Sequence, residues 1–385
     1  MTATAADRSV LIAGVGLHPF GRFPQTVEEL ARVAAADALA DAGVGYGDVE
    51  LTIVANVGEG MAKAQRLAAR LGATGHPVFS VESACASSAA ALLAARDAIE
   101  SGRAGVVLCL GVEKAPRGFI AGAGFEPWQE ASGVGVTPIY FALQAQELLA
   151  ATGGTVQDLA AVSVKNHGNG ALNPNAMYRS PVTAEQVLQS KMVCPPLNLL
   201  MLCTPNEGAA AVVLMSAEQV RRRGVTWPVA VRAVTLATRS PGDWFVPAPS
   251  RLSEVRSSPT LTAAAAAYQE AGLGPGDLDL VECQDTDAAS ELIAYADLGL
   301  CAPGDEVKLL RGGDTQIGGR IPVNPSGGLL SKGEPLGASG LGQVHELVMQ
   351  LRGRAGPRQV RGARTGLAQV MGAGHVSAVT ILAAA

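Results

Sequence analysis

Short apolar runs alternate with amphipathic stretches along the first third of the chain. Runs such as "PVFSV" (77–81) and "AGVVLCLG" (104–111) are typical of buried strands, whereas "TVEELARVAAADALADAG" (26–43) repeats apolar residues at helical spacing. The pattern predicts a strand at 10–16, a helix at 26–43, a strand at 48–57, a helix at 61–72, a strand at 77–81, a helix at 85–101 and a strand at 104–111. Such alternation predicts an α/β fold, with a parallel or mixed sheet covered by helices on both faces.

The same pattern returns in the second half of the chain. "ADALADAGVGYGDVEL" (36–51) aligns with "AAAYQEAGLGPGDLDL" (265–280), and eight of the sixteen positions are identical. Further on, "CASSAAALLAARDAIESG" (85–102) corresponds to "GASGLGQVHELVMQLRG" (337–353). Two matches in the same order indicate an internal duplication. If the halves pack about a pseudo-twofold axis, the loops before the two matched helices approach each other, which places Glu334 near Cys85.

A long segment interrupts the first half between the strand ending at Gly111 and a return strand at 209–217. A connection of this length inside a compact domain is usually functional, as a lid or a binding surface. We therefore expect an N-terminal half (1–111 plus 209–225), an insertion over the active site (112–208) and a C-terminal half (226–385).

Composition and charge narrow the class of protein. The chain has 385 residues, of which 48% are hydrophobic and 16% charged, with a net charge of −5. These values predict large cores and argue against a nucleic-acid binder. We see no membrane-length apolar run and no signal-like N-terminus, so we expect a cytoplasmic protein. The six cysteines show no metal-ligand spacing.

Cys85 is the first candidate for chemistry. It lies in "VFSVESACASSAAALLAA", where a strand and a turn lead into a helix of small residues. Oriented N–H groups at a helix N-terminus favour a thiolate and can bind an oxyanion. A buried structural cysteine is the common alternative in an apolar chain, and position alone leaves both open.

Five segments taken together resemble one family. "VESACASSAAAL", "VSVKNHGNGALNPNA", "LCTPNEGAAAVVL", "NPSGGLLSKGEPLGASGLGQ" and "QVMGAGHVSAVTIL" resemble, in order and spacing, the thiolase superfamily, in its SCP2-type and archaeal-type branch. The likeness spans essentially the whole chain. It implies the duplicated five-layer α-β-α-β-α thiolase fold, usually as a homodimer, with acyl-CoA as substrate and no permanently bound cofactor. It also implies that Cys85 is the acyl-accepting nucleophile.

Two signature loops depart from that resemblance. Where the branch normally has Gly-His-Pro, this chain has Gly333-Glu334-Pro335. Where it normally has His-Asp-Cys-Phe, this chain has Gln284-Asp285-Thr286-Asp287. Both usual histidines are therefore replaced, and so is the cysteine that the branch uses as acid and base.

Physical chemistry suggests what the replacements do. The Gln284 amide can donate to a carbonyl or enolate oxygen, so an oxyanion site survives the loss of histidine. Thr286 hydrogen-bonds but is no base near neutral pH. In a partly dry cleft the pKa of Glu334 rises, which suits a proton shuttle. The alternative is a surface glutamate paired with Lys332.

The resemblance implies roles for several other residues. Backbone N–H groups around Gly372 and Gly374 would complete an oxyanion hole. His375 is either a replacement base or structural. His167, Asp285 and Thr286 would line the substrate and coenzyme A pocket, and His167 also fits a role in ordering the insertion. Asp285 and Asp287 alternatively form a helix N-cap pair, which we prefer for Asp287.

The sequence therefore predicts an acyl-CoA acyltransferase of lipid metabolism that makes or cleaves a carbon–carbon bond next to a thioester through acyl-Cys85. One alternative is a retro-aldolase of the same fold, which needs no acyl-enzyme. Another is a non-catalytic acyl-CoA or lipid carrier. The resemblance also implies a small partner of the DUF35 type, with a zinc ribbon and an OB fold.

Overall fold

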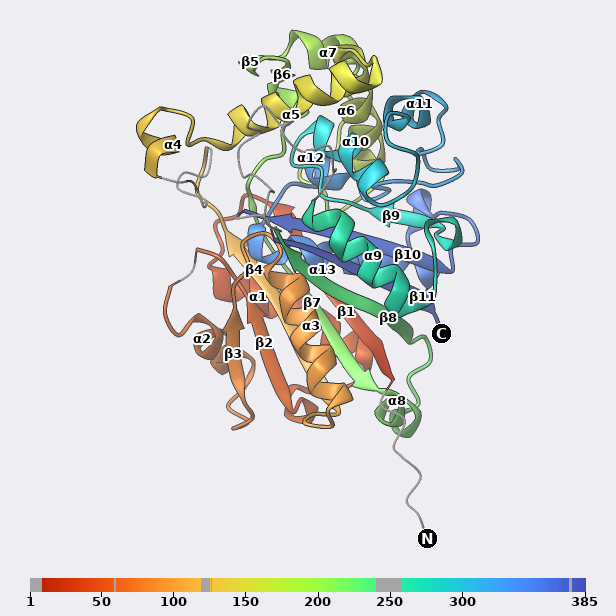
Figure 1. The fold of residues 1–385 in the computed structure, drawn as a ribbon. Coiled ribbons are helices and arrows are strands. Elements are labelled where there is room, and N and C mark those ends of the chain that lie inside the picture. The colour runs from red at the N-terminus through yellow and green to blue at the C-terminus, as the bar shows by residue number, and fades with distance from the viewer. Residues whose placement is uncertain (1–8, 59, 119–124, 126, 240–257, 374–375) are drawn as a thin grey trace.

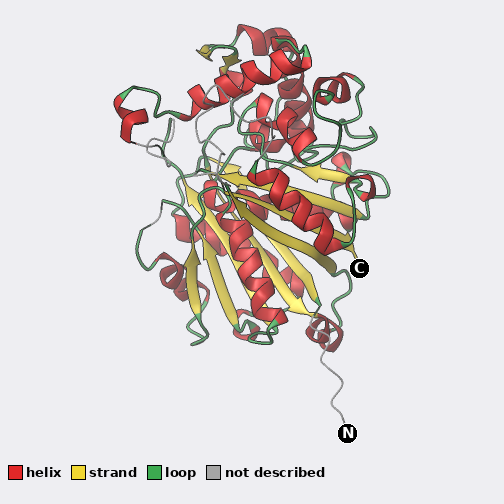
Figure 2. Ribbon diagram, in the orientation of Figure 1, coloured by secondary structure: helices red, strands yellow, loops and turns green. Residues whose placement is uncertain are grey.

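A single nine-stranded sheet organises the molecule. The computed structural model describes residues 9–58, 60–118, 125, 127–239, 258–373 and 376–385. The strand order is β3-β2-β4-β7-β1-β8-β11-β10-β9 (Figures 1 and 2). The strands of this sheet are β1 (Val10–Gly21), β2 (Leu51–Ala55), β3 (Val78–Val81), β4 (Val106–Lys114), β7 (Glu207–Ser216), β8 (Val229–Thr238), β9 (Leu280–Glu282), β10 (Thr365–Gly372) and β11 (Val376–Ala384).

The sheet consists of two copies of one arrangement. Outward from the centre, β1-β7-β4-β2 in one half matches β8-β11-β10-β9 in the other, with the same antiparallel, antiparallel and parallel pairings. The place of β3 is taken in the second half by Val323, which forms an isolated parallel bridge to Val281. The duplication predicted from the sequence is confirmed.

The local structure of the matched segments explains why their glycines recur. Helices α1 (Val27–Ala42) and α9 (Pro259–Ala271) each end at a glycine in the left-handed region, Gly43 with φ of 68° and Gly272 with φ of 65°. A short 3₁₀ turn follows in both halves. In the first half Gly45 N–H donates to Asp48 Oδ2 across 2.9 Å, and the symmetry-related Gly274 N–H makes the same bond at 2.8 Å.

The helices and the two half-sheets form five layers. Helices α1 and α2 (Lys63–Leu71) cover the outer face of the first half, and α9 covers that of the second. Helices α3 (Ser87–Glu100) and α13 (Ser339–Leu351) contact each other and strands of both halves, so they form the middle layer. Within the sheet, β1 and β8 join the two halves through the pairs Leu11 with Ala230 and Ile12 with Val229.

Small residues allow these layers to pack closely. A Cβ atom on Gly14 of β1 would lie 2.3 Å from the carbonyl oxygen of Ala38, and one on Gly16 would lie 2.1 Å from that of Ala34. Because both alanines belong to α1, only glycine lets this helix approach the strand so closely. The Ala- and Gly-rich composition is thus a requirement of the layered packing.

Two insertions build a helical lobe above the sheet (Figure 1). The first, between β4 and β7, contains α4 (Pro127–Ala131), α5 (Thr137–Thr152), α6 (Val156–Ala171), α7 (Ala184–Gln189), β5 (Met192–Cys194) and β6 (Leu197–Asn198). The second, between β9 and α13, contains α10 (Ala288–Asp297), α11 (Glu306–Arg311) and α12 (Gly328–Lys332). The sequence patterns predicted only the first insertion.

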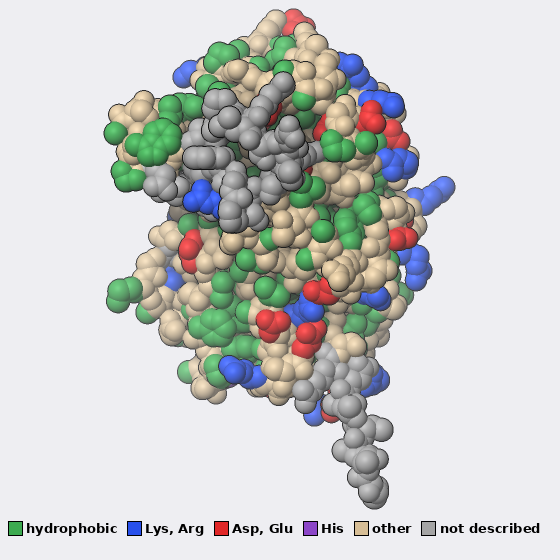
Figure 3. All heavy atoms as spheres, in the orientation of Figure 1, with side chains coloured by type: hydrophobic (Ala, Val, Ile, Leu, Met, Phe, Trp, Pro, Cys, Tyr) green, Lys and Arg blue, Asp and Glu red, His purple; other side chains and the backbone are tan. Residues whose placement is uncertain are grey.

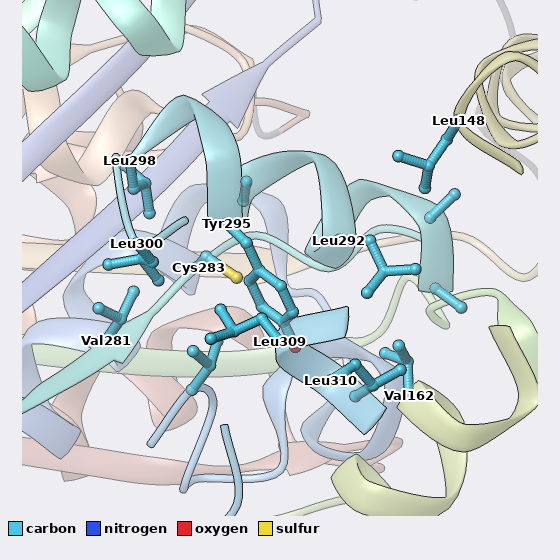
Figure 4. Packing of buried hydrophobic residues seen from close by; sticks show 14 of the residues in the cluster. Leu148, Val162, Val281, Cys283, Leu292, Tyr295, Leu298, Leu300, Leu309 and Leu310 are labelled. Atoms are coloured by element: carbon cyan, nitrogen blue, oxygen red, sulfur yellow. The ribbon is translucent and has the colours of Figure 1, made fainter. Parts of the chain in front are cut away.

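The two insertions share one hydrophobic core. Tyr295 of α10 is fully buried there among leucines of α10 and α11 and Val162 of α6 (Figure 4). Its phenol donates to Glu291, one turn earlier. The lobe therefore fixes α10 and α12 relative to α6, and with them the loops that begin and end the second insertion.

The remaining helix, α8 (Ala217–Arg223), follows β7 and carries three arginines in its last turn. On the face in Figure 3, Lys and Arg side chains alternate with Asp and Glu rather than forming one basic patch. In the described part of the chain, every helix is too short or too polar to cross a membrane.

Candidate active site

Cys85 occupies a strained turn just before α3. The preceding residue, Ala84, has a φ of 48°, which is rare for a residue with a Cβ atom and is typical of functional sites. Ser87 holds the turn, because its hydroxyl donates to Ala84 O and accepts the N–H of Ser83 across 2.8 Å. Helix α3 starts at Ser87 rather than at Cys85, so the thiol belongs to the turn.

The end of β10 lies directly against this turn. A Cβ atom on Gly372 would lie 2.5 Å from the carbonyl oxygen of Ser83, so only glycine fits there. The next residue, Ala373, directs its backbone N–H at the Cys85 sulfur. The loop after Gly372 thus approaches Cys85, with Ala373 as the donor, and the predicted oxyanion hole stays a prediction. Gly374 and His375 lie outside the described residues.

Two backbone hydrogen bonds hold the loop that carries Glu334 in place. Its N–H donates to Thr204 O across 3.0 Å, and its carbonyl accepts the N–H of Asn206 at 3.1 Å. Gly333 has a φ of 92°, and a Cβ atom on it would lie 1.8 Å from Asn206 Nδ2. The Glu334 residue is only 3% exposed, so a solvated surface glutamate is excluded.

The Gln284 side chain bridges the Glu334 carboxylate and the end of β10. Its Oε1 accepts the backbone N–H of Met371 at 2.7 Å, which determines the orientation of the amide. Its Nε2 then donates to Glu334 Oε1 at 2.9 Å and also interacts with the Cys85 thiol. The structure thus brings together three residues singled out from the sequence, Cys85, Glu334 and Gln284.

A fourth member of the cluster was missed by the sequence analysis. Cys203, in the loop before β7, donates from Sγ to Glu334 Oε2 across 3.1 Å. Its backbone N–H is fixed by Thr286 O at 2.9 Å. The segment "LCTPNEGAAAVVL" was part of the family pattern, but nothing in it indicates that Cys203 would meet Glu334. A second thiol therefore enters this site from a loop other than the one where the branch normally has it.

Burial and the Glu334 charge together shift the acidities in this cluster. Burial raises the pKa of Glu334 above its ordinary value of 4.5, although the two thiols partly offset this by donating to the carboxylate. Burial and then the negative charge of Glu334 raise the pKa of both Cys85 and Cys203. The expected lowering of the Cys85 pKa by a helix N-terminus is therefore outweighed. Both thiols are therefore weaker acids here than an exposed cysteine.

The remaining residues of the Gln284 loop serve the framework. Asp285 is fully buried; its carboxylate accepts the N–H groups of Leu329 at 2.6 Å and Leu330 at 3.2 Å, and the Asn166 amide at 2.7 Å. Burial, and then the charge of Glu291, raise its pKa. It anchors α12, which leads into the Glu334 loop, so its described contacts are those of a positioning residue, and its predicted place in the substrate pocket stays a prediction.

Asp287 caps α10 as preferred from the sequence. Its Oδ1 accepts the backbone N–H groups of Ala289 at 2.8 Å and Ser290 at 3.2 Å. Burial raises its pKa to about 6. Thr286 donates to the Ser290 hydroxyl at 3.3 Å, and its carbonyl holds Cys203, so its described contacts are structural.

His167 lies on α6, in the first insertion. It is only 3% exposed, and its Nδ1 has no hydrogen-bond partner among the described residues. Burial lowers its pKa. The ring lies 6.0 Å from that of Tyr178, whose hydroxyl is 3.0 Å from the Thr204 hydroxyl. The ring also forms a hydrogen bond with the Ser180 backbone, and Tyr178 connects it with the loop that carries Cys203.

Comparisons with known protein families match both halves of the chain. The family described as "Thiolase, N-terminal domain" matches residues 10–218, and "Thiolase C-terminal domain-like" matches residues 248–384.

Curated relatives extend along nearly the whole chain. "Acetyl-CoA acetyltransferase" of Methanothermobacter thermautotrophicus is 38% identical, with 97% of this chain and 99% of that protein covered. "Sterol carrier protein 2" of Gallus gallus is 35% identical and covers 99% of this chain, which in turn spans 73% of that protein. "Benzoylsuccinyl-CoA thiolase subunit BbsB" of Thauera aromatica is 34% identical, with 96% of each covered.

Solved structures share the fold. The "Ltp2-ChsH2(DUF35) aldolase" superposes with a TM-score of 0.86 at 24% identity, covering 99% of both chains. Human mitochondrial 3-ketoacyl-CoA thiolase in complex with CoA gives a TM-score of 0.73 at 19% identity over the full length of both chains.

Proposed function

The chain belongs to the thiolase family of acyl-CoA acyltransferases, and from this premise we propose that it makes or cleaves a carbon–carbon bond next to a thioester through an acyl-Cys85 intermediate. The observation that carries the proposal is the contact of the Cys85 thiol with the Glu334 carboxylate and the Gln284 amide, in a turn strained at Ala84. A thiol with an adjacent base and a fixed donor is the arrangement of an activated nucleophile.

Acylation begins when Glu334 takes the Cys85 proton. The sulfur attacks the carbonyl carbon of a β-oxoacyl-CoA, and the developing oxyanion is stabilised by the Ala373 N–H, which already points at the sulfur. Because Glu334 is buried among neutral partners and its pKa is raised, proton transfer from a thiol is less unfavourable than to an exposed carboxylate.

The carbon–carbon bond then breaks, and its electron pair passes to the α-carbon as a thioester enolate. The Gln284 amide is held by Met371 and interacts with the Cys85 sulfur, so its donor group is fixed beside the reacting centre. A second coenzyme A thiol releases the acyl group from Cys85. In the opposite direction the same residues form the bond.

A retro-aldolase is the second candidate, favoured by one finding. The structural neighbour with the TM-score of 0.86 is named an aldolase. Retro-aldol cleavage needs a base, which Glu334 supplies, but no acyl-enzyme, so it leaves the contacts of Cys85 without a function. Cys85 is therefore the residue that distinguishes the two reactions.

We also propose a homodimer and a DUF35-type partner. Strand β3 is one edge of the sheet, and Phe79 on it is 41% exposed, so a second copy can continue the sheet there. The name of the aldolase neighbour includes a DUF35 component. Light scattering of the purified chain tests the dimer, and co-purification with a co-expressed DUF35 protein tests the partner.

Intact mass spectrometry tests the acyl-enzyme. The protein is incubated with acetyl-, acetoacetyl-, succinyl- and benzoyl-CoA, and peptide mapping locates any adduct. We expect one acyl group on Cys85 and neither adduct nor turnover in Cys85→Ala. Carbon–carbon cleavage of a β-hydroxyacyl-CoA by Cys85→Ala at the wild-type rate would establish the aldolase instead. Binding of coenzyme A thioesters with neither adduct nor cleavage would show a carrier.

A further inference from the structure

Two thiols and one carboxylate form a continuous chain of contacts in this site. Glu334 interacts with Cys85 and accepts a hydrogen bond from Cys203 Sγ at 3.1 Å. The Gln284 amide donates to the other carboxylate oxygen, Oε1, and so leaves Oε2 for the Cys203 thiol. The carboxylate therefore stands between two groups that can each give or receive a proton.

The backbone holds Cys203 in this position. Its N–H is bonded to Thr286 O, and Leu202 and Asp287 form an isolated antiparallel bridge. On the other side of the segment, Pro205 and Glu334 form a parallel bridge. The loop is thus a short strand between the Gln284 loop and the Glu334 loop. Cys203 as a residue is partly exposed, and burial of its thiol raises the pKa of that group.

We propose that Cys203 is the second catalytic thiol, which exchanges the α-carbon proton of the substrate with Glu334. This inference rests on the proposed acyl-Cys85 function. Cys85 and Cys203 would be the two ends of a proton relay, with the Glu334 carboxylate as its middle member. The relay places a carboxylate where the branch normally has an imidazole.

The proton balance of cleavage closes without any other reactant. As Cys85 sulfur bonds to the carbonyl carbon, its proton passes to Glu334. The carbon–carbon bond breaks, its electron pair goes to the α-carbon, and the Cys203 S–H donates its proton there. The Cys203 thiolate then recovers a proton from Glu334. The net result is transfer of the Cys85 proton to the α-carbon, with all three side chains ready for release of the acyl group by coenzyme A.

Neutral partners make this relay physically reasonable. Every described side-chain partner of Glu334 is uncharged: two thiols and one amide. A fixed cation would hold Glu334 as a carboxylate throughout, whereas this environment lets it alternate between its two protonation states.

Deuterium exchange separates the relay from the acyl-enzyme. Acetyl-, propionyl- and succinyl-CoA are incubated with the protein in D₂O, and α-deuterium is measured by mass spectrometry; acyl loading of Cys85 is measured in parallel. General acid–base catalysis contributes about 10²- to 10⁴-fold, so Cys203→Ser is expected to lower exchange at least about 100-fold. Acyl loading is expected to fall by less than about tenfold, since Glu334 and Cys85 remain.

Two controls make the outcome decisive. Cys194→Ser removes a thiol in β5 and is expected to leave exchange unchanged. Circular dichroism and thermal unfolding identify any loss of fold in Cys203→Ser. Cys203→Asp restores a titratable group at the same place and is expected to recover part of the exchange with a shifted pH profile.

Exchange by Cys203→Ser at the wild-type rate, or none by the wild type with any of the three thioesters, overturns the proposal. An acyl-Cys85 adduct under those conditions leaves the proposed function intact, whereas its absence refutes the function itself.

Discussion

Gln284 and Glu334 come from opposite ends of the second insertion and meet at 2.9 Å, Nε2 to Oε1. The Met371 N–H fixes the amide from behind, and Thr204 and Asn206 fix the glutamate backbone. Neither position carries the histidine expected from the family resemblance, yet the two replacements are matched to each other. The amide of Gln284 supplies the donor and the carboxylate of Glu334 the acceptor of this hydrogen bond.

The hydrogen bond between Gln284 and Glu334 predicts that Gln284→Glu inactivates the protein without unfolding it. The new carboxylate would face Glu334, and two carboxylates at this distance cannot both ionise, so the pair would retain a proton. Carbon–carbon turnover is expected to fall about 100-fold or more. Steady-state kinetics with circular dichroism as a folding control measures this. Full activity in Gln284→Glu would show that the amide has no part in the reaction.

Glu334 is expected to destabilise the fold in its ionised form. Burial raises its pKa above the unfolded value of 4.5, so the folded state favours the protonated acid. Stability from this group is therefore present at pH below 4.5 and is lost as pH rises through the folded pKa. Glu334→Gln should accordingly raise the free energy of unfolding relative to wild type, by more at pH 8 than at pH 5. Urea titrations at the two pH values test the sign, and an equal difference at both pH values would contradict it.

The duplication explains how much of this site the sequence predicts. Because the helices after Cys85 and Glu334 are symmetry mates, matching "CASSAAAL" to "GASGLGQV" was enough to predict that the two residues lie close. Helix α13 contacts α3 in the middle layer, as that symmetry requires. Hydrophobic periodicity predicted the order of strands and helices, and the two halves share one such pattern.

Cys203 was not predictable in the same way. Cys203 and Glu334 are 131 positions apart in the sequence. They meet because the Cys203 loop lies between the Gln284 loop and the Glu334 loop, and hydrophobic periodicity does not predict this arrangement. The sequence patterns also do not predict the second insertion, because they indicate only a signature loop at 284–287 and a helix that Asp287 caps. Helices α10 and α12 share a hydrophobic core with α6, and this core depends on tertiary packing of side chains around Tyr295.

Gly333 offers a test of the loop geometry. An added Cβ atom would collide with Asn206 Nδ2, and the φ of 92° already disfavours any side chain. Gly333→Ala is therefore expected to displace Glu334 and abolish acyl loading of Cys85. Gly304→Ala is the matched control, since Gly304 has a φ of 97° but open space around its Cβ position. The control should lose only about 1 kcal/mol of stability and keep its activity.

Asp285 is expected to behave as an anchor. In Asp285→Asn, whichever oxygen becomes an amide nitrogen faces a donor, either Leu329 N–H or Leu330 N–H and the Asn166 amide. A buried donor without an acceptor costs about 1–3 kcal/mol, which urea unfolding should detect. Asp305→Asn, at a surface ion pair with Lys308, serves as the control and should change stability by less than about 1 kcal/mol. Equal effects of the two substitutions would contradict the anchoring role.

Alkylation of Cys85 measures the influence of Glu334 directly. Burial and then the Glu334 charge raise the pKa of this thiol, so iodoacetamide should react slowly at pH 7 and faster as pH rises. Glu334→Gln removes the charge but keeps the shape, so the pH profile of alkylation should move to lower pH. The burial contribution remains, which means that the profile should still lie above that of an exposed cysteine. Peptide mapping separates Cys85 from Cys203, whose pKa is raised by the same charge and should move in the same direction. An unchanged or upward-shifted profile at Cys85 would show that the carboxylate does not act on the thiol, and the catalytic role of Glu334 would fall with it.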